Sequence, residues 1–205
     1  MKEYWNSLLT EKSWLILQGL AKEYDFILIG GWAVFLFTKA QKSKDIDIIV
    51  SIKELEKLKK ENLNKNDNLK KYEIKREEID IDIYLEYFSK LAIPVEDIKN
   101  YTTFAEGFKV IIPELLLILK QKAFLDRKNS IKGEKDKLDI LSLIFFSGLE
   151  LKKYWEIVKK YNLTSYTDEL KNLIKDFKDY DSLGMTPKEL KKTKENAISA
   201  LKSFK

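Results

Sequence analysis

The stretch LIGGWAVFLFTKAQKSKDIDIIV, residues 28–50, combines an apolar run, two glycines, a second apolar run and two acids. Asp45 and Asp47 alternate with isoleucines, so on a strand both carboxylates would project from one face and the isoleucines from the other. Aspartate is unfavourable in strands. A strand that buries one face and carries two carboxylates on the other is costly unless something binds those carboxylates.

A second stretch, EIDIDIYLEY at residues 78–87, repeats the arrangement with Asp80 and Asp82. If the two strands are neighbours, three or four carboxylates converge, and like charges that close raise one another's pKa unless a cation lies between them. Two divalent ions about 3.5–4 Å apart would relieve the repulsion and form a phosphoryl-transfer site. The alternative is two half-buried strands whose outer faces are solvated.

The glycines suggest a ligand at the start of a helix. We expect a strand at 26–30, then Gly30 and Gly31, then a buried helix at 32–40. Glycine lets the backbone turn sharply and approach a ligand, and the free N–H groups of a helix N-terminus favour a phosphate. An ordinary strand-to-helix turn would look the same if the glycines stood alone.

The composition excludes several kinds of chemistry. The 205-residue chain has no cysteine and no histidine, which rules out disulfides, Cys/His zinc sites, thiol nucleophiles and histidine acid–base catalysis. Any metal must favour oxygen ligands, which indicates Mg²⁺ or Mn²⁺. The net charge of +5 is compatible with a nucleotide or RNA partner.

The pattern of elements changes along the chain. Strand and helix signals alternate over residues 1–112, where NKNDN at 64–68 is expected to be a loop, and only helical patterns follow over 113–205. We therefore expect an α/β domain and a helical domain packed on it. The N-terminus lacks the apolar segment of a signal peptide, and no apolar run reaches membrane-spanning length. A cytoplasmic location without membrane contact is expected.

The order strand, Gly-Gly, helix, D-h-D-h strand and later acidic strand, where h is any apolar residue, resembles the polymerase β-type nucleotidyltransferase superfamily. The matching segments, LIGGWAV, KSKDIDIIV and EIDIDIYL, lie within residues 26–86. The resemblance implies an α+β fold, in which a mixed sheet flanked by helices is followed by a C-terminal helical bundle. It also implies transfer of a nucleoside monophosphate from an NTP to an acceptor hydroxyl, with two Mg²⁺ or Mn²⁺ ions as cofactors.

By this resemblance, Asp45 and Asp47 are metal ligands, and Gly30 and Gly31 bind the phosphates of the nucleotide. A third carboxylate binds the catalytic metal and activates the acceptor hydroxyl; Asp82 is the choice and Asp80 the alternative. Ser43, two residues before Asp45, lies where relatives often carry Ser or Thr for nucleotide binding. It could equally be an ordinary loop hydroxyl.

The segment PELLLILKQKAFLDR followed by EKDKLDILSL is similar to the AbiEii-type branch, known from toxin–antitoxin and phage-abortive systems. In that branch a K-x-x-A helix precedes D-x-x-D. The resemblance implies that Lys120, with Arg127 on the same helical stripe, contacts the triphosphate, and that Asp136 supports it or the acceptor. Alternatively, Lys120 and Arg127 are edge residues, and Asp136 and Asp139 are solvated or paired.

The acceptor hydroxyl could belong to an RNA such as a tRNA 3′ end, to a protein or to a small molecule. A cognate toxin or antitoxin is a further candidate partner. Lysines interleaved with Tyr and Trp after residue 150 would suit RNA contact. The alternative function is a non-catalytic nucleotide-binding or antitoxin-type interaction module. A generic nucleic-acid-binding domain would fit the charge but explains neither the glycines nor the aspartates.

Overall fold

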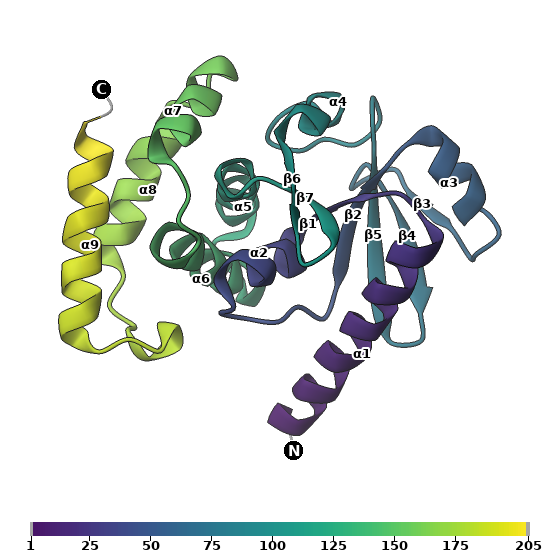
Figure 1. The fold of residues 1–205 in the computed structure, drawn as a ribbon, viewed down its shortest axis with the longest axis horizontal. Coiled ribbons are helices and arrows are strands. Elements are labelled where there is room, and N and C mark those ends of the chain that lie inside the picture. Colours follow the sequence, from purple (N-terminus) through teal and green to yellow (C-terminus); the bar gives the residue numbers. More distant parts are fainter. Residues whose placement is uncertain (1, 204–205) are drawn as a thin grey trace. The chain divides into compact units, whose positions relative to one another are not determined.

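The computed structural model describes the backbone of residues 2–203 and the side chains of residues 7–203. The chain divides after Ile112 into two compact units. The first unit alternates helices and strands, and the second is helical throughout (Figure 1). No helix among residues 2–203 is both long and apolar enough to cross a membrane.

Seven strands form the centre of the first unit. They are β1 (Ile27–Ile29), β2 (Ile46–Val50), β3 (Asn64–Asn66), β4 (Lys71–Arg76), β5 (Ile79–Leu85), β6 (Thr102–Ala105) and β7 (Phe108–Ile111). The helices of this unit are α1 (Lys2–Glu23), α2 (Gly30–Thr38), α3 (Ile52–Leu58), α4 (Val95–Ile98) and the 3-10 turn η1 (Lys99–Tyr101).

The strands form one mixed sheet in the order β3-β4-β5-β2-β1-β7-β6. β2 is parallel to β5 and antiparallel to β1, and β4 is antiparallel to β5. The β2–β5 pairing joins two strands that are far apart in the sequence. It places Asp47 opposite Asp82 in the register.

Alternation of side chains fixes the buried face of this sheet. In β5, Ile79, Ile81 and Ile83 are at most 1% exposed, whereas the side chains between them are polar and partly or fully exposed. The same period-two pattern buries Ile46 and Ile48 in β2. One face of the sheet is therefore apolar core, and the carboxylates lie on the other.

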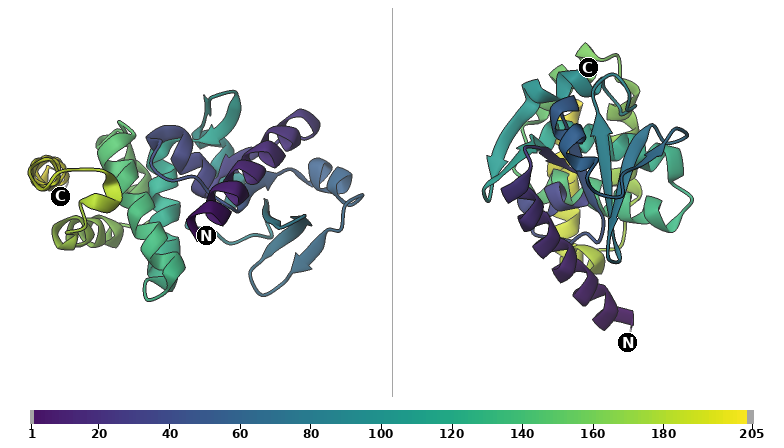
Figure 2. Two further views of the ribbon diagram at one scale, coloured as in Figure 1. Left: turned by 90° about the horizontal axis from the view of Figure 1, so that it is seen from below. Right: turned by 90° about the vertical axis from the view of Figure 1, so that its right-hand side faces the viewer.

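The second unit consists of helices α5 (Pro113–Arg127), α6 (Ile131–Phe146), α7 (Leu151–Lys160), α8 (Ser165–Asp176) and α9 (Pro187–Lys202), with the 3-10 turn η2 (Asp181–Leu183). Within it, α5 lies beside α6, and α8 lies beside α9 (Figures 1 and 2). Thr186 begins α9 with a complete capping box to Glu189.

The fold class expected from the sequence is confirmed: a mixed sheet with helices is followed by helices alone. Two local predictions were wrong. Residues 64–66 form the edge strand β3 instead of a loop. Asp45 lies one residue before β2, in a bend, so only Asp47 of this pair belongs to the strand.

Candidate active site

Asp47 and Asp82 lie side by side on the parallel strands β2 and β5. Both are partly buried, and the Asp82 side chain is 20% exposed. Neighbouring strands are about 4.8 Å apart, so two negative charges are held close together on the polar face of the sheet. Tyr84, two residues after Asp82, points its hydroxyl toward Asp47 Oδ1 at 3.5 Å.

Gly30, the first residue of α2, lies directly against Asp47. Its φ of +69° is in the left-handed region, and a Cβ at this position would lie 2.0 Å from Asp47 Oδ2. Both features require glycine. Gly31 follows, buried in the first turn of the helix. The absence of side chains therefore lets the N-terminus of α2 approach the carboxylate, where its free N–H groups can bind an anion.

Lys71 is the cation beside this pair. Its Nζ lies 2.6 Å from Asp82 Oδ2 and 3.0 Å from a carboxylate oxygen of Glu73. Glu73 pairs directly with Asp82 across the antiparallel strands β4 and β5. Asp47, Asp82 and Glu73 thus form a row of three carboxylates across neighbouring strands, and Lys71 bridges the second and third.

Burial and the neighbouring charge of Asp47 raise the pKa of Asp82 from 3.8 to about 6, against the lowering effect of Lys71. An acid whose pKa is higher in the folded state binds its proton more tightly there. Its ionisation at neutral pH therefore reduces the stability of the fold. Such a carboxylate is a candidate for binding a cation or accepting a proton.

Three other residues of the first unit were expected at the site: Asp45, Ser43 and Asp80. Asp45 precedes β2 and is partly buried, and Ser43 is 2% exposed. Asp80 is 62% exposed and lies 3.9 Å from Lys75. The register therefore places Asp82, and not Asp80, next to Asp47. Which of the two acts as the third carboxylate stays a prediction.

The donor set suits a hard divalent ion, because it consists of carboxylate oxygens and excludes nitrogen and sulfur ligands. The Asp47 carboxylate itself occupies the space that a Cβ at residue 30 would fill, so this contact depends on glycine. Across the described side chains, however, no three acidic residues lie in an arrangement that could hold a metal ion. Asp47 and Asp82 provide two adjacent ligands, with Asp45 two residues before the first.

Lys120, Arg127 and Asp136 belong to the second unit and meet there, together with Asp139. Lys120 Nζ lies 2.6 Å from Asp139 Oδ2 and 3.5 Å from Asp136 Oδ1. Arg127 holds Asp136 through two hydrogen bonds of 2.7 and 3.1 Å. Lys120 and both aspartates are at most 8% exposed. The four charges form a network between α5 and α6.

Lys71, Glu73 and Tyr84 were not identified from the sequence. The segment KKYEIK reads as a strand, but its register against β5 depends on the turn between the strands. The contact of Lys71 with Asp82 could have been predicted from the hairpin of β4 and β5. Lys71 is two residues before Glu73, which pairs with Asp82, and a long side chain can reach such a diagonal neighbour.

Comparison with known proteins shows the fold. No family model matches the chain, and no curated protein matches it. A putative nucleotidyltransferase from H. pylori has a similar structure, with 18% sequence identity, a TM-score of 0.51 and coverage of 98% of each chain.

This chain has a nucleotidyltransferase-like fold. The expected mixed sheet, with its flanking helices and C-terminal helices, matches that structure. Other solved structures are also similar to this chain. JHP933 from Helicobacter pylori has 18% identity and a TM-score of 0.49, with 99% of this chain and 95% of that chain covered. An antigenic nucleotidyltransferase-like protein from Paracoccidioides brasiliensis has 21% identity and a TM-score of 0.43, with 77% and 91% covered.

Gly30→Ala tests the contact with Asp47. We predict a loss of about 2–4 kcal/mol in the free energy of unfolding, from the left-handed backbone and the collision with Asp47 Oδ2. Gly107→Ala is the matched control in the same unit, because φ is +84° but the space is open. Its loss should be about 1 kcal/mol. Equal losses in urea unfolding would contradict the close approach.

Asp82→Asn tests the raised pKa. Below pH 3.8 the carboxyl is protonated in both states; above 3.8 the unfolded chain ionises first, and stability falls until the pH passes about 6. At about 1.36 kcal/mol per pH unit, this costs at most about 3 kcal/mol. The substitution should therefore stabilise the metal-free protein by about 1–3 kcal/mol at pH 7.5 and little at pH 4. Lys71 keeps Glu73 as a partner.

The measurement is urea unfolding at both pH values. Asp80→Asn is the control, because this side chain is exposed and its ion pair with Lys75 is long. It should change stability by less than about 0.5 kcal/mol at either pH. An Asp82→Asn effect of the same size at pH 4 and pH 7.5 would show that the carboxylate does not have a raised pKa.

Proposed function

We propose that the protein transfers a nucleoside monophosphate from an NTP to an acceptor hydroxyl. The observation that carries the proposal is the pair Asp47 and Asp82 on adjacent strands, placed against the glycine that begins α2. A structural strand gains nothing from two repelling, half-buried carboxylates. The nucleotidyltransferase-like fold supports the same conclusion.

In this reaction the acceptor oxygen attacks the α-phosphorus of the NTP and a new P–O bond forms. The bond from the α-phosphorus to the α–β bridging oxygen breaks, and pyrophosphate leaves with its electron pair. The acceptor proton passes to a base, for which Asp82 is the candidate because its carboxylate lies beside Asp47 on the polar face of the sheet. The N–H groups at the start of α2, from Gly30 and Gly31, bind phosphate oxygens.

Mg²⁺ or Mn²⁺ would be held by the adjacent carboxylates of Asp47 and Asp82, with Asp45 in the bend before β2 as the further expected ligand. When bound, it would neutralise charge on the triphosphate. Ser43, buried just before these residues, would support the loop that presents Asp45 and could bind the nucleotide. Most of the rate would come from positioning and charge neutralisation, as is usual in phosphoryl transfer.

Lys120 and Arg127 would bind the triphosphate, with Asp136 holding both in place. Their network supports this role because it keeps two cations ordered on one helix before a ligand arrives. Asp139 is the main partner of Lys120. A ligand phosphate would compete with these aspartates for the two cations.

We propose that the acceptor is an RNA, such as a tRNA 3′ end, and that a protein hydroxyl is the alternative. We also propose that the protein acts together with a cognate toxin or antitoxin. The net charge of +5 supports RNA. In α7, Tyr154 is fully buried and donates to Gln121 Oε1 at 2.9 Å, so it cannot stack on a base. Trp155 is partly exposed, with the ammonium of Lys159 6.0 Å from its ring centre.

Label transfer tests the proposal. The protein is incubated with each α-³²P-labelled NTP, Mg²⁺ and total tRNA or cell extract. We predict a labelled acceptor with the wild-type protein. The variant Asp45→Ala/Asp47→Ala should lose about 100-fold or more of this activity, because the charge of the triphosphate is no longer neutralised. No label on any acceptor would contradict the enzyme and favour a non-catalytic nucleotide-binding module.

The third carboxylate is resolved in the same assay. Asp82→Asn should abolish transfer, whereas Asp80→Asn should retain it because that side chain lies away from Asp47. Loss in the Asp80 variant alone would reverse the assignment. Label on a protein band instead of RNA would replace RNA by protein as the acceptor.

A further inference from the structure

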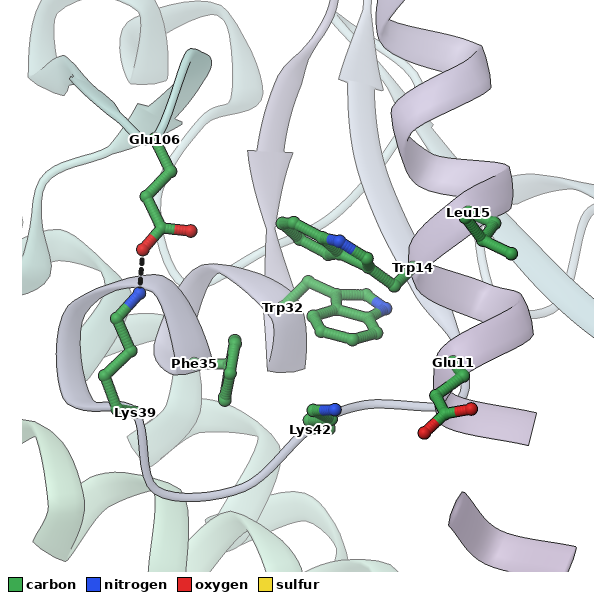
Figure 3. Close-up of a pocket in the computed structure, with 8 residues that line it drawn as sticks. All are labelled: Glu11, Trp14, Leu15, Trp32, Phe35, Lys39, Lys42 and Glu106. Carbon is green, nitrogen blue, oxygen red and sulfur yellow. Dashed lines mark hydrogen bonds and ion pairs between the residues drawn. The ribbon is translucent and has the colours of Figure 1, made fainter. Parts of the chain in front are cut away.

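A pocket of about 550 Å³ lies in the first unit, and its lining includes none of the row of carboxylates described above. Figure 3 shows side chains from α1, from α2 with the loop that follows it, and from the turn between β6 and β7 around it. Its lining residues are Glu11, Trp14, Leu15, Trp32, Phe35, Lys39, Lys42 and Glu106. The volume is in the range of small-molecule sites, which are largely apolar with a few polar groups.

Three aromatic rings form one wall of the pocket. Trp14 and Trp32 have ring centres 5.0 Å apart, and Phe35 meets Trp32 edge-on at 5.6 Å. Trp32 is 1% exposed, and its indole N–H donates to Ser13 Oγ at 2.8 Å, which fixes the ring. Trp14 and Phe35 are partly exposed, so each can offer aromatic surface to a ligand.

Two opposite charges at the pocket have no partner among the described side chains. Glu11 and Lys42 are exposed, and neither has a hydrogen bond or ion pair within residues 7–203. The other charges of the lining, Lys39 and Glu106, form an ion pair with each other (Figure 3). Within the described part of the chain, the pocket therefore offers an acceptor and a cation that form no ion pair, beside an aromatic wall.

The pocket is close to the candidate active site along the chain. Lys42 precedes Asp45 by three residues, so their Cα atoms are at most about 11 Å apart. α2 also connects the two places: Gly30 touches Asp47 at its N-terminus, and Phe35 lines the pocket about 7.5 Å further along the helix axis. A few nucleotides of a stacked strand, at about 3.4 Å each, cover such distances.

We propose that this pocket binds a nucleotide unit of the nucleic-acid acceptor. The base would stack on Trp14 and Phe35, because aromatic rings bind bases of any sequence. The Glu11 carboxylate would accept hydrogen bonds from amino or imino groups on the base edge. Lys42 would bind the phosphate. The proposal that the ligand is a nucleotide rests on the proposed function. A free nucleotide would make the same contacts as a nucleotide within RNA, and the experiment below distinguishes the two.

The test measures binding without turnover. A fluorescein-labelled 12-nucleotide single-stranded RNA is titrated with wild-type protein and followed by anisotropy, and AMP and GMP are added as competitors. Trp14→Leu should raise the Kd for RNA about tenfold or more through lost stacking. Lys42→Ala should raise the Kd and reduce the slope of log Kd against log salt by about one. Glu11→Gln should weaken binding and leave that slope unchanged.

Lys53→Ala is the control, because Lys53 is an exposed lysine of the same unit outside the pocket, and it should lower affinity by less than twofold. Lys42 and Glu11 are exposed, so their variants keep the test valid if Trp14→Leu does not fold. If AMP and GMP do not displace the labelled RNA, the pocket binds a nucleotide only as part of an RNA strand. If they displace it from the wild-type protein but not from Trp14→Leu, the pocket also binds free nucleotides by the same chemistry.

Wild-type affinity for RNA in the Lys42 and Glu11 variants would overturn the inference, as would a wild-type protein that binds neither RNA nor free nucleotides. The result is separable from the proposed function. Asp45→Ala/Asp47→Ala should still bind RNA, because neither residue lines the pocket. If the protein has no transferase activity, RNA binding by the pocket would still be observed. Conversely, if the pocket binds no RNA, transfer of the nucleotide to a protein acceptor could still be observed.

Discussion

The repulsion between Asp47 and Asp82 is the physical constraint that shapes the candidate active site. Both are fixed by the parallel pairing of β2 with β5, whose isoleucines are fully buried and cannot change register. A shift by one residue would send the carboxylates into the core. The packing of the apolar face therefore holds two like charges close together, and their repulsion lowers the stability of the folded state.

The surroundings of the pair reduce this cost without removing it. Lys71 neutralises part of the charge, yet the pKa of Asp82 is still raised to about 6 because burial and Asp47 outweigh the ammonium. At the same place, Gly30 brings the N-terminus of a helix against Asp47. Stability is commonly sacrificed in this way at sites that bind a charged ligand, and a triphosphate with a divalent ion would satisfy both the carboxylates and the helix N-terminus.

Local sequence patterns were sufficient for much of the fold and for the face on which the site lies. Alternation in β5 identified the buried isoleucines and the polar face with Asp82, and the strand–glycine–helix order located α2. The edge strand β3 has no apolar residue, so periodicity gave no signal for it. Contacts of Lys71 and the proximity of Asp47 to Asp82 depend on cross-strand register, which no local pattern contains.

Binding of a metal–nucleotide complex by the Asp47 and Asp82 carboxylates is tested by calorimetric titration with α,β-methylene-ATP, an analogue that cannot release pyrophosphate, in Mg²⁺ and in EDTA. We predict that the wild-type protein binds this analogue only when Mg²⁺ is present, that Asp47→Asn does not bind it, and that Asp80→Asn does. Binding that is equally strong in EDTA, or unchanged in Asp47→Asn, would contradict the claim that this carboxylate pair binds a metal–nucleotide complex.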